Sequence, residues 1–203
     1  MTQSYIEKVL PGKPGGPLLF TFHGTGGDEN QFPAFGRDLL ADATIVSPRG
    51  DVSEYGAARF FRRTGEGVYD MDDLARATAK MKAYAEAHVA AAKPSAVYGL
   101  GYSNGANILA STLFAAPGLF DAVVLMHPLI PFEPRIDGDL KGRRVLITAG
   151  RRDPICPPVY TSRLEAWLRD AGADVILEWH DGAHEVRPNE VEAARRFLQP
   201  VGA

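Results

Sequence analysis

The chain has 203 residues, of which 45% are hydrophobic and 23% are charged, a mixture that is typical of a globular protein and not of a disordered one. The formal net charge is −3, and lysine and arginine are spread along the sequence, so it lacks the basic footprint that nucleic-acid binders need. A single cysteine, Cys156, excludes an intramolecular disulfide and is expected to be a packing residue.

The N-terminal residues and the apolar runs of the sequence give an expectation for where the protein resides. The first eight residues, MTQSYIEK, lack the basic start and apolar run of a secretory signal. No stretch approaches the roughly 18 consecutive apolar residues of a membrane span. We therefore expect cytoplasmic residence, a small-molecule partner, no nucleic-acid partner and no stable association with a membrane.

Short apolar segments alternate with longer segments of helical period along the whole chain. Strands are expected at residues 18–22, 44–47, 96–100, 122–126, 145–149 and 175–179. The clearest helix is expected at residues 72–91, and further helices near residues 29, 104, 158 and 189. This alternation predicts one α/β domain over residues 1–203, with a mostly parallel sheet covered by helices on both faces. Ligands bind such sheets beyond the carboxyl ends of the strands.

The most informative motif follows the strand predicted at residues 96–100. Residues 101–105, Gly-Tyr-Ser-Asn-Gly, have the pattern G-x-S-x-G, and a helical pattern begins directly after them. A strand, a sharp turn and a helix together lift the hydroxyl of the central serine out of the turn, and the glycines leave space where a Cβ would collide. Ser103 is therefore the predicted nucleophile. The alternative is a serine that only caps the helix.

A serine nucleophile needs a base and an acid, in the chain order serine, acid, histidine. Asp153 lies in the loop after the strand at residues 145–149, at the expected edge of the sheet. Asp121 precedes its strand, and Asp181 is too close to His184 in sequence to reach its ring easily. Asp153 is therefore the predicted acid.

Two histidines compete for the role of base. His180 adjoins the end of the strand at residues 175–179, where little reach is left, and is also readily explained as a half-buried sheet residue. His184 lies deeper in a glycine-containing loop that can fold back over the serine. We predict His184 as the base. The fall in activity toward acid pH is then expected near the ordinary pKa of a histidine, about 6.5.

Acyl transfer also needs hydrogen-bond donors for a developing oxyanion. Residues 23–28, His-Gly-Thr-Gly-Gly-Asp, follow the first predicted strand, and their glycines allow backbone N–H groups to turn toward the crevice. We assign this oxyanion hole to the N–H groups of Thr25 and Asn104, with His23 bracing the loop. A phosphate-binding use of the glycines is disfavoured, because neither nucleotide-binding glycine motif is present.

Five segments together resemble the phospholipase/carboxylesterase family of the α/β-hydrolase superfamily, in particular its small bacterial predicted esterases. They are residues 23–29, 47–50, 101–107, 153–154 and 182–184, which read HGTGGDE, SPRG, GYSNGAN, DP and GAH. The resemblance implies an α/β-hydrolase fold with little or no lid, ester hydrolysis without a metal or another cofactor, and often a homodimer. It also carries over Ser103, Asp153 and His184 as a catalytic triad.

The sequence departs from that family pattern beside the predicted nucleophile. Better-known members have Phe and Gln flanking the serine and Leu in the oxyanion loop, whereas Tyr102, Asn104 and Thr25 stand here. Backbone donors survive such changes. The acyl-chain preference of those members does not carry over.

The substrate pocket is expected from two further segments. Phe60 and Phe61 are predicted to lie beside the substrate, with Arg59 or Arg62 steering an anionic group; core packing with solvated arginines is an equally good account. The last group of predicted pocket residues consists of Leu129, Ile130 and Ile155. No insertion is long enough for a cap domain, so the site should be small, mostly apolar and open.

The resulting prediction is a serine hydrolase that cleaves small carboxylic esters, or thioesters, by two-step acyl transfer. A transacylase would use the same residues, and a non-catalytic binding protein could retain the same fold. Dehalogenase and epoxide-hydrolase chemistry are set aside, because they need a carboxylate where Ser103 stands.

Overall fold

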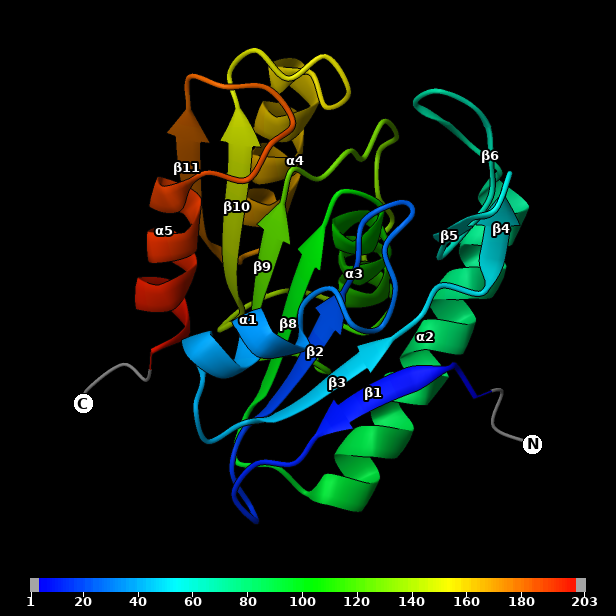
Figure 1. The fold of residues 1–203 in the computed structure, drawn as a ribbon. Coiled ribbons are helices and arrows are strands. Elements are labelled where there is room, and N and C mark those ends of the chain that lie inside the picture. The colour runs from blue at the N-terminus through cyan, green and yellow to red at the C-terminus, as the bar shows by residue number, and fades with distance from the viewer. Residues whose placement is uncertain (1–3, 200–203) are drawn as a thin grey trace.

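A seven-stranded sheet forms the centre of the computed structural model, which describes residues 4–199 (Figure 1). All neighbouring strands run parallel except the antiparallel edge strand β1. This arrangement confirms the predicted α/β architecture. In spatial order the strands are β1 (Glu7–Leu10), β3 (Thr44–Pro48), β2 (Leu18–Phe22), β8 (Val97–Tyr102), β9 (Ala122–Met126), β10 (Arg144–Gly150) and β11 (Asp174–His180).

Helices cover both faces of the sheet, which is why its strands are apolar throughout. One face packs against α2 (Met71–Ala92), α3 (Asn104–Ala115) and α4 (Pro158–Asp170), and the other against α1 (Pro33–Leu39) and α5 (Pro188–Leu198). In β2 the side chains of Leu18 and Phe20 enter the first core and that of Leu19 enters the second. Alternate residues of one strand thus belong to opposite cores.

Four of the five helices begin within one residue of the position predicted from sequence. The exception is α1, which begins at Pro33 and not near Glu29. Residues before it form a turn in which the Asp28 carboxylate accepts the Asn30 N–H at 2.8 Å, and Pro33 suits the first helical position because it has no N–H to satisfy. Within residues 4–199 no helix has the length and apolar content needed to cross a membrane.

Several short strands were not expected from the sequence. Besides β1, two hairpins follow β3, and both lie beside α2 (Figure 1). They contain few residues and alternate only briefly, so hydrophobic periodicity does not reveal them. The first joins β4 (Val52–Glu54) to β5 (Ala57–Arg59), and the second joins β6 (Arg63–Gly65) to β7 (Val68–Tyr69).

The turn between β8 and α3 places Ser103 in a strained backbone conformation, with φ 53° and ψ −118°. The turn is possible because two backbone segments approach each other closely at glycines. A Cβ on Gly101 would lie 2.5 Å from the carbonyl oxygen of Gly105, and one on Gly105 would lie 2.3 Å from that of Phe22. This confirms the expectation that neither position has room for a Cβ atom.

Gly105→Ala is therefore expected to destabilise the protein by about 1–3 kcal/mol or more, because the contacted atoms are backbone and cannot yield easily. Gly118→Ala is the matched control: its Cβ would have nothing within 4 Å, and a change within about 0.5 kcal/mol is expected. Urea unfolding followed by circular dichroism measures both. Equal losses in the two variants would contradict this account of the turn.

Candidate active site

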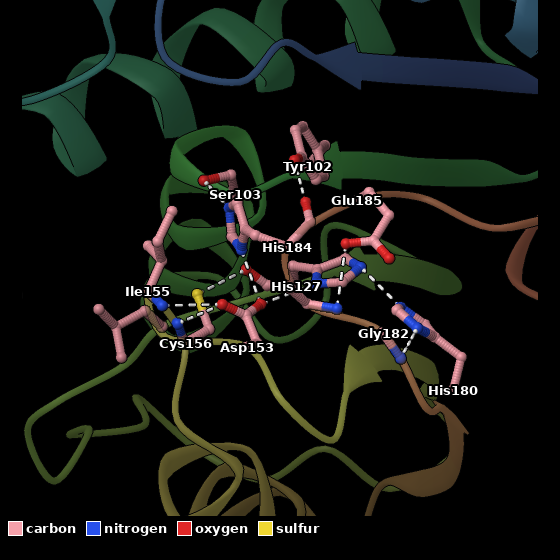
Figure 2. Close-up of polar contacts among 12 residues, drawn as sticks. Tyr102, Ser103, His127, Asp153, Ile155, Cys156, His180, Gly182, His184 and Glu185 are labelled. Atoms are coloured by element: carbon pink, nitrogen blue, oxygen red, sulfur yellow. Dashed lines mark hydrogen bonds and ion pairs between the residues drawn. The ribbon is translucent and has the colours of Figure 1, made fainter.

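Three side chains from separate loops meet beyond the carboxyl ends of the sheet strands (Figure 2). Ser103 lies between β8 and α3, Asp153 follows β10, and His184 follows β11. The His184 Nε2 atom lies 2.9 Å from the Ser103 Oγ, and its Nδ1 atom lies 2.7 Å from the Asp153 Oδ2. A hydroxyl, an imidazole and a carboxylate thus form one hydrogen-bonded chain, the arrangement that activates a serine hydroxyl.

The competing histidine and acids lie elsewhere. His180 ends β11, is buried and contacts Glu190, with 3.2 Å between its Nε2 and the Glu190 Oε2. The Asp121 carboxylate accepts the Val97 N–H at the amino end of the strands, and the Asp181 side chain is 85% exposed. Of the candidates that the sequence offered for a triad, the structure therefore brings together Ser103, Asp153 and His184.

The Asp153 carboxylate is held by donors on both of its oxygens. Its Oδ1 accepts the N–H groups of Ile155 and Cys156, each at 2.9 Å, while His184 and His127 share its Oδ2. Burial alone would raise the pKa of Asp153, but these hydrogen bonds hold it well below its ordinary value. The group therefore stays ionised and can orient and stabilise a protonated His184.

The neighbouring thiol of Cys156 is not a competing nucleophile. Its Sγ donates to the carbonyl oxygen of His127 at 3.2 Å, and the side chain is buried. Burial, with the nearby charge of Asp153 as a smaller cause, raises the pKa of the Cys156 thiol. The thiol therefore stays protonated, in agreement with its predicted role as a packing residue.

The predicted oxyanion donors lie beside the serine. Thr25 and Asn104 both line the cavity that contains Ser103. Among residues 4–199, neither of their backbone N–H groups donates a hydrogen bond within the protein, so both are free for a ligand oxygen. Their side chains are tethered instead: the Thr25 hydroxyl accepts from Arg59 at 2.7 Å, and the Asn104 Oδ1 accepts the Phe60 N–H at 2.8 Å.

His23 braces the oxyanion loop from below, as the sequence suggested. Its Nδ1 donates to the carbonyl oxygen of Gly24 at 2.7 Å, and its Nε2 accepts the Gly50 N–H at 2.9 Å. Burial lowers the pKa of His23, and one donating and one accepting nitrogen fit a neutral ring. The ring therefore ties the first loop to the chain after β3 without adding charge to the site.

The serine opens into a cavity of about 330 Å³. Its walls contain both apolar and charged side chains. The hairpin β6–β7 forms part of the wall, through Arg63, Glu66, Gly67 and Tyr69. The lining residues are Thr25, Arg59, Arg63, Glu66, Gly67, Tyr69, Tyr102, Ser103, Asn104, Asn107, Leu129, Ile155, Cys156 and His184. The predicted pocket residues Leu129 and Ile155 are among them.

Residues 55–186 match the dienelactone hydrolase family. The chain belongs to that family. It is also 38% identical over 186 residues to MhqD of Bacillus subtilis (strain 168), a protein assigned as a hydrolase, and this match covers 90% of the chain and 92% of MhqD.

Two solved structures are especially similar to this family member. A carboxylesterase from Bacillus cereus superposes with a TM-score of 0.90 at 34% identity, covering 96% of this chain and 93% of the other. The protein Atu2452 of Agrobacterium tumefaciens strain C58, of unknown function, superposes with a TM-score of 0.93 at 59% identity, covering 98% of each chain. The fold and the predicted family resemblance are thereby confirmed, and the protein is a hydrolase of the dienelactone hydrolase and carboxylesterase type.

Three residues predicted to contact the substrate lie in the hydrophobic core of this hydrolase. Phe60 and Phe61 are fully buried and Ile130 is 1% exposed, and none of them lines the cavity. Phe60 packs on Phe22, with 5.8 Å between ring centroids, and Phe61 on Tyr69 at 4.8 Å. The prediction for these three residues was wrong: the segment between the two short hairpins packs Phe60 and Phe61 into the core, and the segment after β9 does the same with Ile130.

The arginines around the cavity also differ from expectation. Arg62 is 60% exposed and pairs with Asp70 at 3.1 Å, away from the cavity. Arg59 and Arg63 line it instead, and both contact Glu54, at 3.5 Å and 2.8 Å. Of the two arginines proposed to steer an anionic group, only Arg59 is therefore placed at the cavity.

A polar cluster that the sequence did not reveal fixes the cavity wall at Leu129. The Asn107 Oδ1 accepts the Leu129 N–H at 2.7 Å, and the Asn107 Nδ2 donates to the Tyr69 hydroxyl at 2.8 Å. That hydroxyl donates to the Leu129 carbonyl oxygen at 2.7 Å. Both backbone groups of Leu129 are thus satisfied by side chains from α3 and β7.

His127 is a further residue whose role the sequence did not reveal. It follows β9 directly, is fully buried, and has φ 51°. Its Nδ1 lies 2.9 Å from the Asp153 Oδ2 and its Nε2 lies 3.0 Å from the Glu190 Oε1. Burial alone would lower the pKa of His127, but these two carboxylates raise it to about 9. A polar residue at the carboxyl end of a buried strand was the available signal.

His127, His180 and Glu190 also have the composition of a metal site, with ligand atoms within 4.8 Å of one another. However, the Gly182 N–H donates to the His180 Nδ1 at 2.9 Å, so a neutral His180 carries its proton on Nε2, the atom that faces the cluster. That proton occupies the position a metal would need. The cluster fits protons better than a metal ion, and metal independence stays a prediction.

The charge on His127 predicts how stability depends on pH. Its pKa is about 9 in the folded protein and about 6.5 as an ordinary value, so its stabilising contribution is complete below pH 6.5 and is lost as the pH rises through 9. We expect the free energy of unfolding to fall across this interval in the wild type, and to fall less in His127→Asn. Urea titrations at several pH values measure both slopes, and parallel slopes would show that His127 is neutral in the folded state.

Proposed function

We propose that this protein is a serine hydrolase that cleaves small carboxylic esters through an acyl-enzyme on Ser103. The observation that carries the proposal is the hydrogen-bonded chain from Ser103 Oγ through both nitrogens of His184 to Asp153, with distances of 2.9 and 2.7 Å. The free N–H groups beside the serine and membership of a hydrolase family support it.

In the first step His184 removes the proton of Ser103 as the oxygen attacks the ester carbonyl carbon. The carbonyl oxygen becomes negatively charged and accepts hydrogen bonds from the N–H groups of Thr25 and Asn104. The protonated His184 is stabilised by the ionised Asp153. It then gives its proton to the leaving alcohol, or to the thiol of a thioester, and the acyl group remains on Ser103.

In the second step water takes the place of the alcohol. His184 accepts a proton from the water as its oxygen attacks the acyl carbon, and the same donors stabilise the second oxyanion. Return of the proton to the Ser103 oxygen releases the carboxylic acid. A transacylase would pass the acyl group to an added alcohol or amine at this step, so product analysis with and without such an acceptor separates the two activities.

Ser103→Ala is expected to reduce kcat/KM toward p-nitrophenyl acetate by at least about 10⁴-fold and to abolish labelling by a fluorophosphonate probe, because the Ser103 Oγ is the hydroxyl that contacts the His184 Nε2. Ser111→Ala is the matched control: it makes the same change in the same region, in α3, where the Ser111 hydroxyl only donates to the Asn107 carbonyl oxygen. Circular dichroism verifies folding of both variants. Retained turnover in a folded Ser103→Ala variant would overturn the proposal.

The cavity size predicts the chain-length preference. A volume of about 330 Å³ accommodates a short acyl group with its alcohol, and charged Arg59, Arg63 and Glu66 in the walls disfavour a long alkyl chain. Among p-nitrophenyl esters we expect kcat/KM to be highest for acetate to butyrate and at least about tenfold lower for decanoate. A rate that increases up to decanoate would show that the acyl chain binds outside this cavity.

A further inference from the structure

A second group of buried ionisable side chains lies on the side of Asp153 away from Ser103 (Figure 2). His127 and Glu190 are fully buried, and His180 is 7% exposed. His127 touches Asp153 with its Nδ1 and Glu190 with its Nε2, at 2.9 and 3.0 Å, and His180 touches the other Glu190 oxygen at 3.2 Å. The three residues come from the end of β9, the end of β11 and the first turn of α5.

The protons of this cluster can be placed from its contacts. The His127 Nδ1 faces a carboxylate oxygen and must carry a proton. Its Nε2 lies 3.0 Å from the Glu190 Oε1 and 3.5 Å from the His180 Nε2. The carboxylate oxygen is the closer of the two, so we place a second proton on the His127 Nε2, where it offsets the charge of Glu190. Because the Arg187 N–H donates to the Glu190 Oε2 at 2.6 Å, that carboxylate is also oriented from its own helix.

The second proton belongs on the ring of His127. Burial alone would raise the pKa of Glu190, but the neighbouring His127, with Thr148 as a further cause, lowers it below its ordinary value. Burial alone would lower the pKa of His127, but Asp153 and Glu190 raise it to about 9, as described above. Near neutral pH the cluster therefore consists of an imidazolium between two carboxylates.

We propose that His127 is a positioning residue of the catalytic apparatus: a buried imidazolium that Glu190 keeps charged and that holds the Asp153 carboxylate in place for His184. The proposal rests on the proposed serine-hydrolase function. In this proposal Glu190 maintains the charge of His127. Glu190 contacts His127 on the side that faces away from Asp153. It also explains why α5, which covers the face of the sheet opposite to α3, carries the buried carboxylate of Glu190.

A positive charge at His127 acts on the same carboxylate that orients His184. The two rings lie 5.1 Å apart between centroids and share the Asp153 Oδ2. The imidazolium offsets part of the Asp153 charge that acts on His184. The ionisable groups that face His127 from all sides are Tyr102, Asp153, Cys156, His180, His184 and Glu190.

The first experiment observes the charge without using activity. Nitrogen chemical shifts of ¹⁵N-histidine-labelled wild type, assigned by comparison with His127→Asn, should show both ring nitrogens of His127 protonated at pH 7. In Glu190→Gln the ring should become neutral within about one unit of pH 7, because one compensating charge is gone. Glu192→Gln removes an exposed carboxylate from the same helix and should leave His127 charged. A neutral His127 in the wild type, or stoichiometric bound metal, would overturn the proposal.

The second experiment tests the link to catalysis through the pH dependence of kcat/KM for a p-nitrophenyl ester. In Glu190→Gln we expect the fall on the acid side to move to higher pH by about one unit, and the maximum to drop about tenfold to 100-fold with little change in KM. The pH profile of Glu192→Gln should match the wild type. If Glu190→Gln lowered the maximum of kcat/KM without shifting its pH profile, Glu190 and His127 would have only a structural role. That result would refute the proposal.

His127→Asn separates charge from shape. Asparagine tolerates the positive φ of residue 127 and places an amide N–H near the position of Nδ1, so the bond to Asp153 can persist without the charge. We expect this variant, and its combination with Glu190→Gln, to show the same shift to higher pH. A wild-type profile in folded His127→Asn would contradict the role of the charge. If instead Ser103→Ala retained turnover while the nitrogen shifts stood, the proposed function would fail and the charged cluster would remain.

Discussion

The site depends on one buried negative charge, the carboxylate of Asp153. A fully buried carboxylate stays ionised only if donors replace the water it has lost. Here the donors come from its own loop, through the N–H groups of residues 155 and 156, and from two histidines on neighbouring strand exits. Satisfying this charge therefore fixes the loops after β9, β10 and β11 relative to one another, and with them the position of His184.

The parts of this arrangement that could be predicted from sequence are those set by local chemistry. The turn around Ser103 requires glycines at fixed spacing, and the chain order of serine, acid and histidine follows from strands that all end at one edge of the sheet. The strands of the sheet were located because both of their faces are buried, which gives continuous apolar runs such as Leu18–Phe22. Strand β1 was missed because three of its four residues are exposed.

The parts that could not be predicted depend on how distant segments pack. Phe60 and Phe61 form an apolar pair beside arginines, a pattern that fits a pocket wall as well as a core, and only the hairpin geometry places them at full burial. Glu190 reads as a capping residue of α5, which it is, since it accepts the Arg187 N–H. Its contact with His127 joins residues far apart in sequence, and no local pattern encodes that contact.

Stability alone does not explain the cluster beside Asp153. Burying charged groups costs desolvation energy, and replacing a buried ion pair with packed apolar residues is often neutral or stabilising. A fold that needed only a filled core at the ends of β9 and β11 would therefore gain little from an imidazolium and a second carboxylate. The charge of the cluster has a role if it acts on a catalytic group. The group that His127 contacts is Asp153, the carboxylate that orients His184. On this argument the opposite helical layer, through Glu190, contributes to the electrostatics of the site as well as to the core.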